Sequence, residues 1–317
     1  MPVLANPHST FTVPTVFPTV TVETWPNAIS GDNFPLYTPS NIVSTLGSGT
    51  VGPNPLILSS SFMTVLLNGQ GRGITGTAST SYNASNYQIT YDPTGTGTFS
   101  YTAHRDWFQP GTPYEIGMVE VGGTGGNYIG GQNQNTNVIG STAINNGTVR
   151  SWKPTSDRVV VWFTGGSSGD AIFQYYITGR ALRIHMSYFN TTGISRNIRM
   201  ARGGDPDYNG ANTNYNSNNT RVDTSKVYAT SPDTGIVFAI YCPGNGYTKG
   251  TAVKTGWDGA AVNPCTESLN NTNDGNGDNA IYAGVDCGAV AAGGNVGINF
   301  YYCFGTSSAD AYGTIGV

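Results

Sequence analysis

Two short acidic segments contain the residue types that bind calcium. Asp205 and Asp207 flank a proline, and Asp274 and Asp278 lie in a segment of Asn, Asp and Gly. Ca²⁺ takes six to eight oxygen ligands, which carboxylates, amide carbonyls and glycine turns can supply. Ordinary Asx-type turns have the same composition, and the second segment lacks the spacing and terminal Glu of a twelve-residue calcium loop. Calcium is therefore a candidate cofactor, and no other cofactor is expected.

The four cysteines all lie in the last quarter of the chain. Their spacing matches no zinc pattern, and an even number in one region indicates two disulfides. Cys242 ends one apolar run and Cys303 lies near the end of another. If those strands are neighbours, the two Cα atoms approach the ~4.4–6.8 Å that a disulfide allows. We predict Cys242–Cys303 and Cys265–Cys287, with four unpaired thiols as the alternative.

Motifs that suggest an enzyme are better explained as turns. Residues 165–169 match G-x-S-x-G, but they lie between two strand-like runs instead of before a helix. Residues 71–76 match G-x-G-x-x-G without the helix that dinucleotide binding requires. The histidines, His8, His104 and His185, are too scattered to predict a metal site. Glycosidase carboxylates need only spatial proximity, and no pair stands out, so we predict that the protein is not an enzyme.

The elements that position these residues are expected to be strands. Apolar residues alternate with others along residues 182–189 and 296–304, a period of two that indicates a buried face. Residues 159–163, 172–177 and 236–241 are continuous apolar runs, typical of strands covered on both faces. Clusters of Gly, Asn, Ser and Thr separate these runs. No segment of ten or more residues has the 3.6-residue period of a helix. The sequence predicts an all-β fold, a large antiparallel β-sandwich.

The first 55 residues differ from the rest. They contain nine of the seventeen prolines and only two charged residues, Glu23 and Asp32. Thr alternates with apolar residues there, but proline confines such a strand to a sheet edge. We predict an extended Pro/Thr-rich N-terminal arm at 1–55 and a β-sandwich domain at 56–317, with 56–104 as a candidate small β subdomain. Such an arm, ordered against a second copy of the chain, predicts a homo-oligomer.

The composition restricts the classes of partner. Only 10% of the 317 residues are charged, against about 25% in an average protein, and the net charge is −4. No Lys/Arg cluster is present to displace counterions from phosphate, so we expect no nucleic-acid binding. No run of ~18 apolar residues exists, so we expect no membrane insertion. The N-terminus also lacks the pattern of a secretory signal peptide.

Several segments together resemble the β-sandwich modules of large bacterial surface adhesins and of some phage and virus structural proteins. They are residues 111–115, 188–193, 197–202, 205–207, 277–281, 288–293 and 297–304. The resemblance implies a super-sandwich shape and an N-x-R…D-P-D corner. In such a corner Arg199 or Arg202 would pair with Asp205 or Asp207. It implies no catalytic activity, and the Pro/Thr arm and the four cysteines depart from the pattern.

These features predict a non-enzymatic structural protein of a virion: a capsid, decoration, fibre or tail component. Its partners would be other copies of itself and other virion or surface proteins. The alternative is a secreted, extracellular or cell-surface adhesin or carbohydrate-binding module. In that case Tyr- and Asn-rich loops would bind a host glycan, since tyrosine combines an apolar ring with a polar tip.

Overall fold

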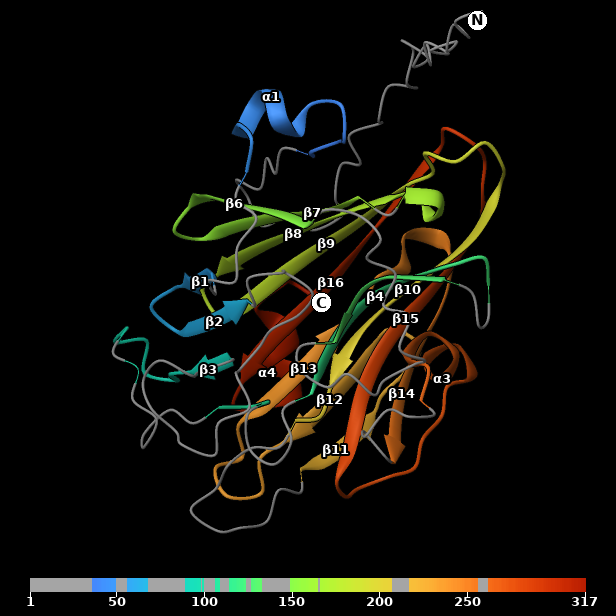
Figure 1. The fold of residues 1–317 in the computed structure, drawn as a ribbon. Coiled ribbons are helices and arrows are strands. Elements are labelled where there is room, and N and C mark those ends of the chain that lie inside the picture. Colours follow the sequence, from blue (N-terminus) through green and yellow to red (C-terminus); the bar gives the residue numbers. More distant parts are fainter. Residues whose placement is uncertain are drawn as a thin grey trace, which may run out of the picture.

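The computed structural model describes residues 36–49, 56–67, 89–97, 99, 106–108, 114–123, 127–132, 149–164, 166–206, 217–255 and 262–317 (Figure 1). The strands are β1 (Leu56–Ser59), β2 (Met63–Leu67), β3 (Ile89–Tyr91), β4 (Glu115–Val121), β5 (Asn127–Gln132), β6 (Val149–Thr155), β7 (Arg158–Thr164), β8 (Asp170–Thr178), β9 (Ala181–Phe189), β10 (Arg196–Gly204), β11 (Asn218–Arg221), β12 (Lys226–Thr230), β13 (Val237–Tyr241), β14 (Thr248–Thr255), β15 (Asn279–Val290) and β16 (Asn295–Gly305). The helices are α1 (Ile42–Leu46), α3 (Pro264–Asn270) and α4 (Ser308–Gly313), with short 3₁₀ turns η1 (Gly166–Ser168) and η2 (Gly244–Gly246).

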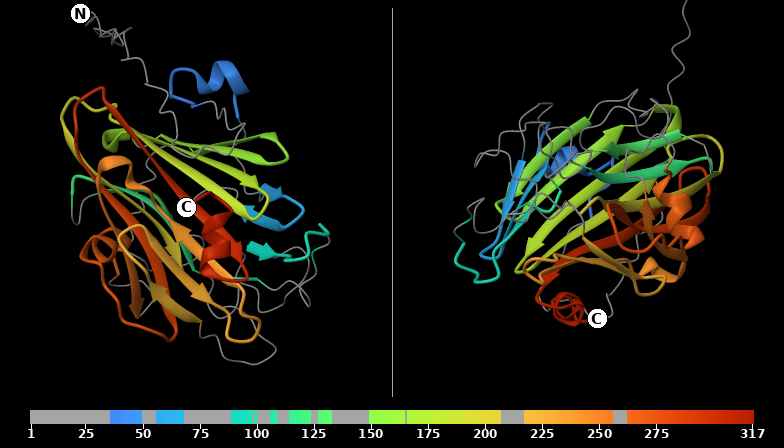
Figure 2. Two further views of the ribbon diagram at one scale, coloured as in Figure 1. Left: turned by 180° about the vertical axis from the view of Figure 1, so that it is seen from behind. Right: turned by 90° about the horizontal axis from the view of Figure 1, so that it is seen from below.

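Two antiparallel sheets pack face to face, as the two views of Figure 2 show. The larger has eight strands in the order β11-β12-β13-β16-β9-β8-β7-β6, and the smaller has five in the order β14-β15-β10-β4-β5. Their inner faces enclose the main hydrophobic core. This arrangement confirms the predicted all-β antiparallel sandwich.

Strand β9 illustrates how the alternation in the sequence becomes two faces. Leu182, Ile184, Met186 and Tyr188 point into the main core, because successive side chains of a strand point to opposite faces. The intervening side chains, among them His185, lie on the outer face of the eight-stranded sheet. That outer face is also buried along β9, so both faces of this strand are covered.

A third sheet, β1-β2-β3, lies within the segment proposed as a small subdomain. Its apolar side chains, such as Leu58 and Val65, join the main core instead of forming one of their own. Tyr91 stacks on Phe304 of β16 at a ring-centroid distance of 5.0 Å. Of the predicted arm, residues 1–35 and 50–55 lie outside the described part of the chain.

Short helices cover the outer faces of both large sheets. Ile42 of α1 packs on the eight-stranded sheet near β6 and β7, and α4 packs on the same sheet near β13 and β16. Cys265 of α3 packs on the five-stranded sheet. The side chain of Asn263 accepts hydrogen bonds from the main-chain N–H groups of Cys265 and Thr266, which fixes the start of α3. None of the helices described is long and apolar enough to cross a membrane.

Candidate functional site

The outer face of the eight-stranded sheet has a polar band between two apolar patches. Ile172 of β8 packs in the patch under α1. Ala181 of β9 and Cys303 of β16 pack in the patch under α4. Between the two patches the same strands place polar and aromatic side chains on this face, because a strand that presents Ala181 outward also presents every second residue after it.

One cross-strand row within this band combines three tyrosines with three cations. The strand register pairs neighbours along the row one after another. We call it the tyrosine row; in strand order from β7 to β12 it consists of Arg158, Tyr176, Arg183, Tyr301, Tyr241 and Lys226. Arg183 is 4% exposed, and the other five side chains are half-buried.

The rings and cations of the row interact along its length. The guanidinium carbon of Arg158 lies 4.8 Å from the ring centroid of Tyr176. The rings of Tyr241 and Tyr301 are 5.9 Å apart. The ammonium of Lys226 lies 5.9 Å from the ring centroid of Tyr241. The cation–π contacts restrain the rings of Tyr176 and Tyr241, and the ring contact with Tyr241 restrains Tyr301.

A second row of buried polar side chains lies beside the first. Gln174, His185 and Asn299 face one another across β8, β9 and β16, and each is at most 7% exposed. Arg183 Nε donates to Asn299 Oδ1 at 3.4 Å, and His185 Nδ1 lies 3.0 Å from the same oxygen. Because arginine can only donate, the amide oxygen faces both groups, and His185 carries its proton on Nδ1.

His185 is held neutral. Burial, opposed by the hydrogen bond to Asn299 and reinforced by the charge of Arg183, lowers the pKa of His185 to about 4. With the proton on Nδ1, Nε2 has the lone pair. A Cβ at Gly297 would lie 2.9 Å from this Nε2, so only glycine at 297 leaves room for the ring.

The second row also contains polar atoms with unused hydrogen-bonding capacity. Both amide atoms of Gln174, and Nδ2 of Asn299, are buried with no hydrogen-bond partner in the part of the chain that the structure describes. A buried polar atom left unpaired destabilises a fold by about 1–3 kcal/mol.

The predicted Arg–Asp corner is wrong for Arg202. Arg202 Nη2 lies 2.5 Å from Oε1 of Glu115, and both side chains are fully buried between the sheets. The Tyr302 hydroxyl donates to the same Glu115 oxygen at 2.6 Å, and Arg202 Nη1 donates to the Tyr175 hydroxyl at 3.1 Å. Arg202 points inward because it shares the face of Met200, so it pairs with a carboxylate on that face.

Arg199 and Asp205, two other members of the predicted corner, do not pair with each other. Arg199 faces outward, with Nη1 3.6 Å from Glu120 Oε2 and Nε 3.4 Å from Asp286 Oδ2. Asp207 lies outside the described residues. Asp205 is 2% exposed, and it is not the carboxylate that pairs with Arg202.

Of the four candidate calcium ligands, the structure brings two together. Asp278 precedes β15 beside the end of β10, where Gly204 pairs with Ile281, and the pKa of Asp205 is raised well above its ordinary value by burial and by the charge of Asp278. Asp274 lies apart and forms an ion pair with Lys254 at 3.3 Å. Among the described residues, no group of three or more His, Cys, Asp and Glu side chains forms a metal-ligand cluster.

The predicted disulfides are wrong: all four cysteines are free and buried. Cys242 packs in the core between the sheets, whereas Cys303 packs on the outer face under α4. Cys287 likewise packs inward and Cys265 outward. Each predicted pair is therefore divided by a sheet. Burial is the main cause that raises the pKa of Cys242, Cys287 and Cys303 to about 12.

Sequence reasoning missed both polar rows. Tyr176, Arg183 and Tyr301 are far apart in the sequence and form no motif. The period of two in the sequence was the signal that could have found them. It places Arg183 and His185 on the same face of their strand, and it places Tyr301 on the face of its own strand opposite the apolar residues. Only the strand register shows that these phases meet on one face.

No family model matches the sequence, and no curated protein matches it significantly. Solved structures with a related fold include a protein of Escherichia coli K12 assigned as an aldose 1-epimerase, 8% identical, with a TM-score of 0.44 over 80% of this chain and 99% of that one. A galactose mutarotase related enzyme of Lactobacillus acidophilus is 10% identical, with a TM-score of 0.41 over 80% and 98%. A polysaccharide lyase is 11% identical, with a TM-score of 0.39 over 84% of this chain and 35% of that one.

These comparisons correct the prediction of function. The similar structures are named as an epimerase, a mutarotase-related enzyme and a polysaccharide lyase. They contradict the prediction of a virion structural protein (capsid, decoration, fibre or tail) and the prediction that the protein is not an enzyme. At such low identity and TM-score, the similarity to these structures carries no information about this chain's own substrate.

Proposed function

We propose that the protein binds carbohydrate along the tyrosine row. The observation that carries the proposal is the placement of three tyrosines among three cations on one sheet face. Tyrosine rings offer flat apolar faces to the C–H groups of a sugar and a polar tip to its hydroxyls. Arginine and lysine donate hydrogen bonds to hydroxyl and carboxylate oxygens.

The size and charge of the row favour an acidic oligosaccharide. The row crosses six strands, and strands are spaced about 4.8 Å apart, so it extends over about 24 Å. That length suits several sugar units. The row contains three cations, Arg158, Arg183 and Lys226, which attract acidic groups on a glycan.

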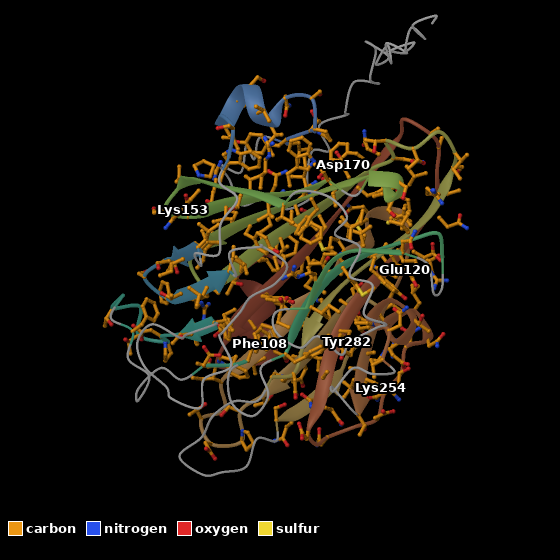
Figure 3. The ribbon with its side chains drawn as sticks, viewed as in Figure 1. Phe108, Glu120, Lys153, Asp170, Lys254 and Tyr282 are labelled. Carbon is orange, nitrogen blue, oxygen red and sulfur yellow. The ribbon has the colours of Figure 1, made fainter. Side chains whose placement is uncertain are left out.

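The test compares two lysines of similar exposure on different sheets. Acidic and neutral oligosaccharides are screened on an array, and the tightest binder is titrated into the wild-type chain, Lys226→Gln and Lys254→Gln. Lys226 ends the row, whereas Lys254 lies on β14 of the five-stranded sheet (Figure 3). An exposed charge contributes up to about 1 kcal/mol, so Lys226→Gln should bind up to about fivefold more weakly. Equal affinity in all three proteins would contradict the proposal.

A second candidate function is catalysis on the bound saccharide. It is favoured by one observation: His185 is neutral at physiological pH, with its Nδ1 proton directed at Asn299 and with Nε2 packed against Gly297 and not hydrogen-bonded to a described residue. A neutral imidazole beside the row can accept a hydrogen bond or a proton from a sugar hydroxyl. Its low pKa makes it a weak base, but keeps it unprotonated at neutral pH.

The two functions are separated by His185→Gln. Each saccharide that binds is incubated with the protein and followed by ¹H NMR. If His185 takes part in catalysis, the wild-type chain converts the saccharide, and His185→Gln binds it with unchanged affinity but does not convert it. Conversion at the same rate by both proteins would contradict the role of His185.

A further inference from the structure

Asp205 is a buried carboxylate that no described residue neutralises. It follows the last residue of β10, and its main-chain N–H donates to the carbonyl of Tyr114 at 3.0 Å, which fixes its position. Its side chain is almost wholly buried. Oδ2 is buried without a hydrogen-bond donor, and a buried ionised carboxylate is strongly unfavourable unless a donor or a cation compensates it.

The group in contact with Asp205 is another carboxylate. Asp278 lies in the turn before β15, and the register that pairs Gly204 with Ile281 places this turn beside Asp205 at the end of β10. Burial, the charge of Asp278 and a hydrogen bond to it raise the pKa of Asp205 well above its ordinary value. The turn is held by two amides: Asn279 Nδ2 donates to the carbonyl of Gly275 at 2.8 Å, and Asn219 Nδ2 donates to that of Gly277 at 3.3 Å. The two carboxylates are thus brought together by a built turn, and two adjacent like charges need a cation or a shared proton between them.

The cationic side chains nearest in sequence are engaged elsewhere. Arg202 is committed to Glu115 on the inner face of the sheet. Lys254, the other cation near this turn, pairs with Asp274. No described Lys or Arg therefore forms an ion pair with Asp205.

We propose that Asp205 and Asp278 bind a calcium ion, at a site separate from the tyrosine row. Ca²⁺ accepts carboxylates in mono- or bidentate form and tolerates irregular geometry, so two aspartates from different segments can share it. Water and main-chain carbonyls commonly complete such a site. With one ligand buried and the other exposed, we expect an affinity of about 10⁻⁴–10⁻³ M, as in other weak calcium modules.

The ion would join two segments that are distant in the sequence, the end of β10 and the turn before β15. Its binding should therefore raise the melting temperature. The site does not depend on carbohydrate binding, and it can be tested with calcium alone.

The experiment measures calcium binding by isothermal titration and by thermal melts in 10 mM CaCl₂ and in EDTA. The variants are Asp278→Asn, which removes the charge of an exposed ligand, and Asp274→Asn, a control in the same turn whose carboxylate pairs with Lys254 and accepts a hydrogen bond from the Thr255 N–H. We expect calcium to raise the melting temperature of the wild-type chain and of Asp274→Asn by about 2–4 °C. Asp278→Asn should show neither the shift nor the heat of binding.

Two results would overturn the proposal. One is the absence of any calcium-dependent heat or shift in melting temperature in the wild-type chain. This result would mean that Asp205 and Asp278 share a proton instead of binding calcium. The other is an equal calcium response in Asp278→Asn and the wild-type chain, which would place the ion elsewhere.

Discussion

Arg202 and Glu115 form an ion pair in the centre of the sandwich, with Arg202 Nη2 2.5 Å from Glu115 Oε1 and neither side chain exposed. They lie diagonally on the paired strands β10 and β4, where Gly117 is directly opposite Arg202. A Cβ at Gly117 would lie 1.9 Å from Arg202 Nη1. Glycine at this position is therefore what allows the guanidinium to lie flat between the sheets and reach Glu115.

Replacing Glu115 with glutamine should strongly destabilise the fold. The substitution keeps the size of the side chain but leaves the charge of Arg202 buried without its counter-charge, and breaking a buried pair in this way lowers the free energy of unfolding by about 3–5 kcal/mol. The measurement is urea unfolding. As a control, Lys254→Gln breaks an ion pair that is about 30% exposed and should change stability by under roughly 1 kcal/mol. Equal effects of the two substitutions would show that the buried pair has no special role.

The stability of the fold should depend on the protonation of His185. The pKa of His185 is lowered to about 4 in the folded chain, against about 6.5 for an unfolded histidine. The unfolded state therefore binds the proton more readily. The contribution of neutral His185 to the free energy of unfolding is fully present above pH 6.5 and decreases as the pH falls from 6.5 to 4. The total loss below pH 4 is up to about 3 kcal/mol.

Unfolding experiments at pH 7, 6, 5 and 4 test this dependence. His185→Gln keeps a polar side chain at the site and removes its titration, so its stability should fall less steeply over the same range. Parallel curves for the two proteins would mean that His185 does not titrate below its ordinary pKa.

All four cysteines should remain as thiols. Each predicted pair is divided by a sheet, with Cys242 and Cys287 in the main core and Cys303 and Cys265 on outer faces. Burial also raises the pKa of Cys242 to about 12, which suppresses the reactive thiolate. A thiol reagent should therefore label the native protein slowly and label four thiols once it is unfolded. Disulfide-linked peptides in a non-reducing digest of freshly purified protein would contradict this arrangement.

The sequence predicts the strands of the main core well and the polar sites poorly. Alternation along residues 182–189 and 296–304 corresponds to β9 and β16, because burial of one face imposes a period of two. The Gly/Asn-rich segment that forms β5 (Asn127–Gln132) has no such period, so its sequence does not indicate a strand. Its composition is typical of turns, and it forms a strand because β4 pairs with it at the edge of the sheet.

The disulfide prediction was wrong because the sequence does not show how the strands are paired. Cys303 falls in the phase of Tyr301 and so on the outer face, which the sequence shows. That Cys242 continues the inward phase of Phe238 and Ile240 is also visible in the sequence. What the sequence does not show is the register that places Ala239 beside Cys303, and this register puts the two thiols on opposite sides of one sheet.

The most direct test of the proposed function is the affinity of an acidic oligosaccharide for two tyrosine variants. Tyr301→Ala removes a ring from the centre of the tyrosine row, and Tyr247→Ala removes a ring that is 40% exposed and lies outside it. Both are titrated calorimetrically with the tightest binder from the array, after circular dichroism melts have shown that they are folded. We predict that Tyr301→Ala binds about two- to tenfold more weakly, corresponding to the ~0.5–1.5 kcal/mol of one ring contact, and that Tyr247→Ala binds like the wild-type chain. Unchanged affinity in folded Tyr301→Ala, or no binding of any oligosaccharide to the wild-type chain, would contradict carbohydrate binding at this face.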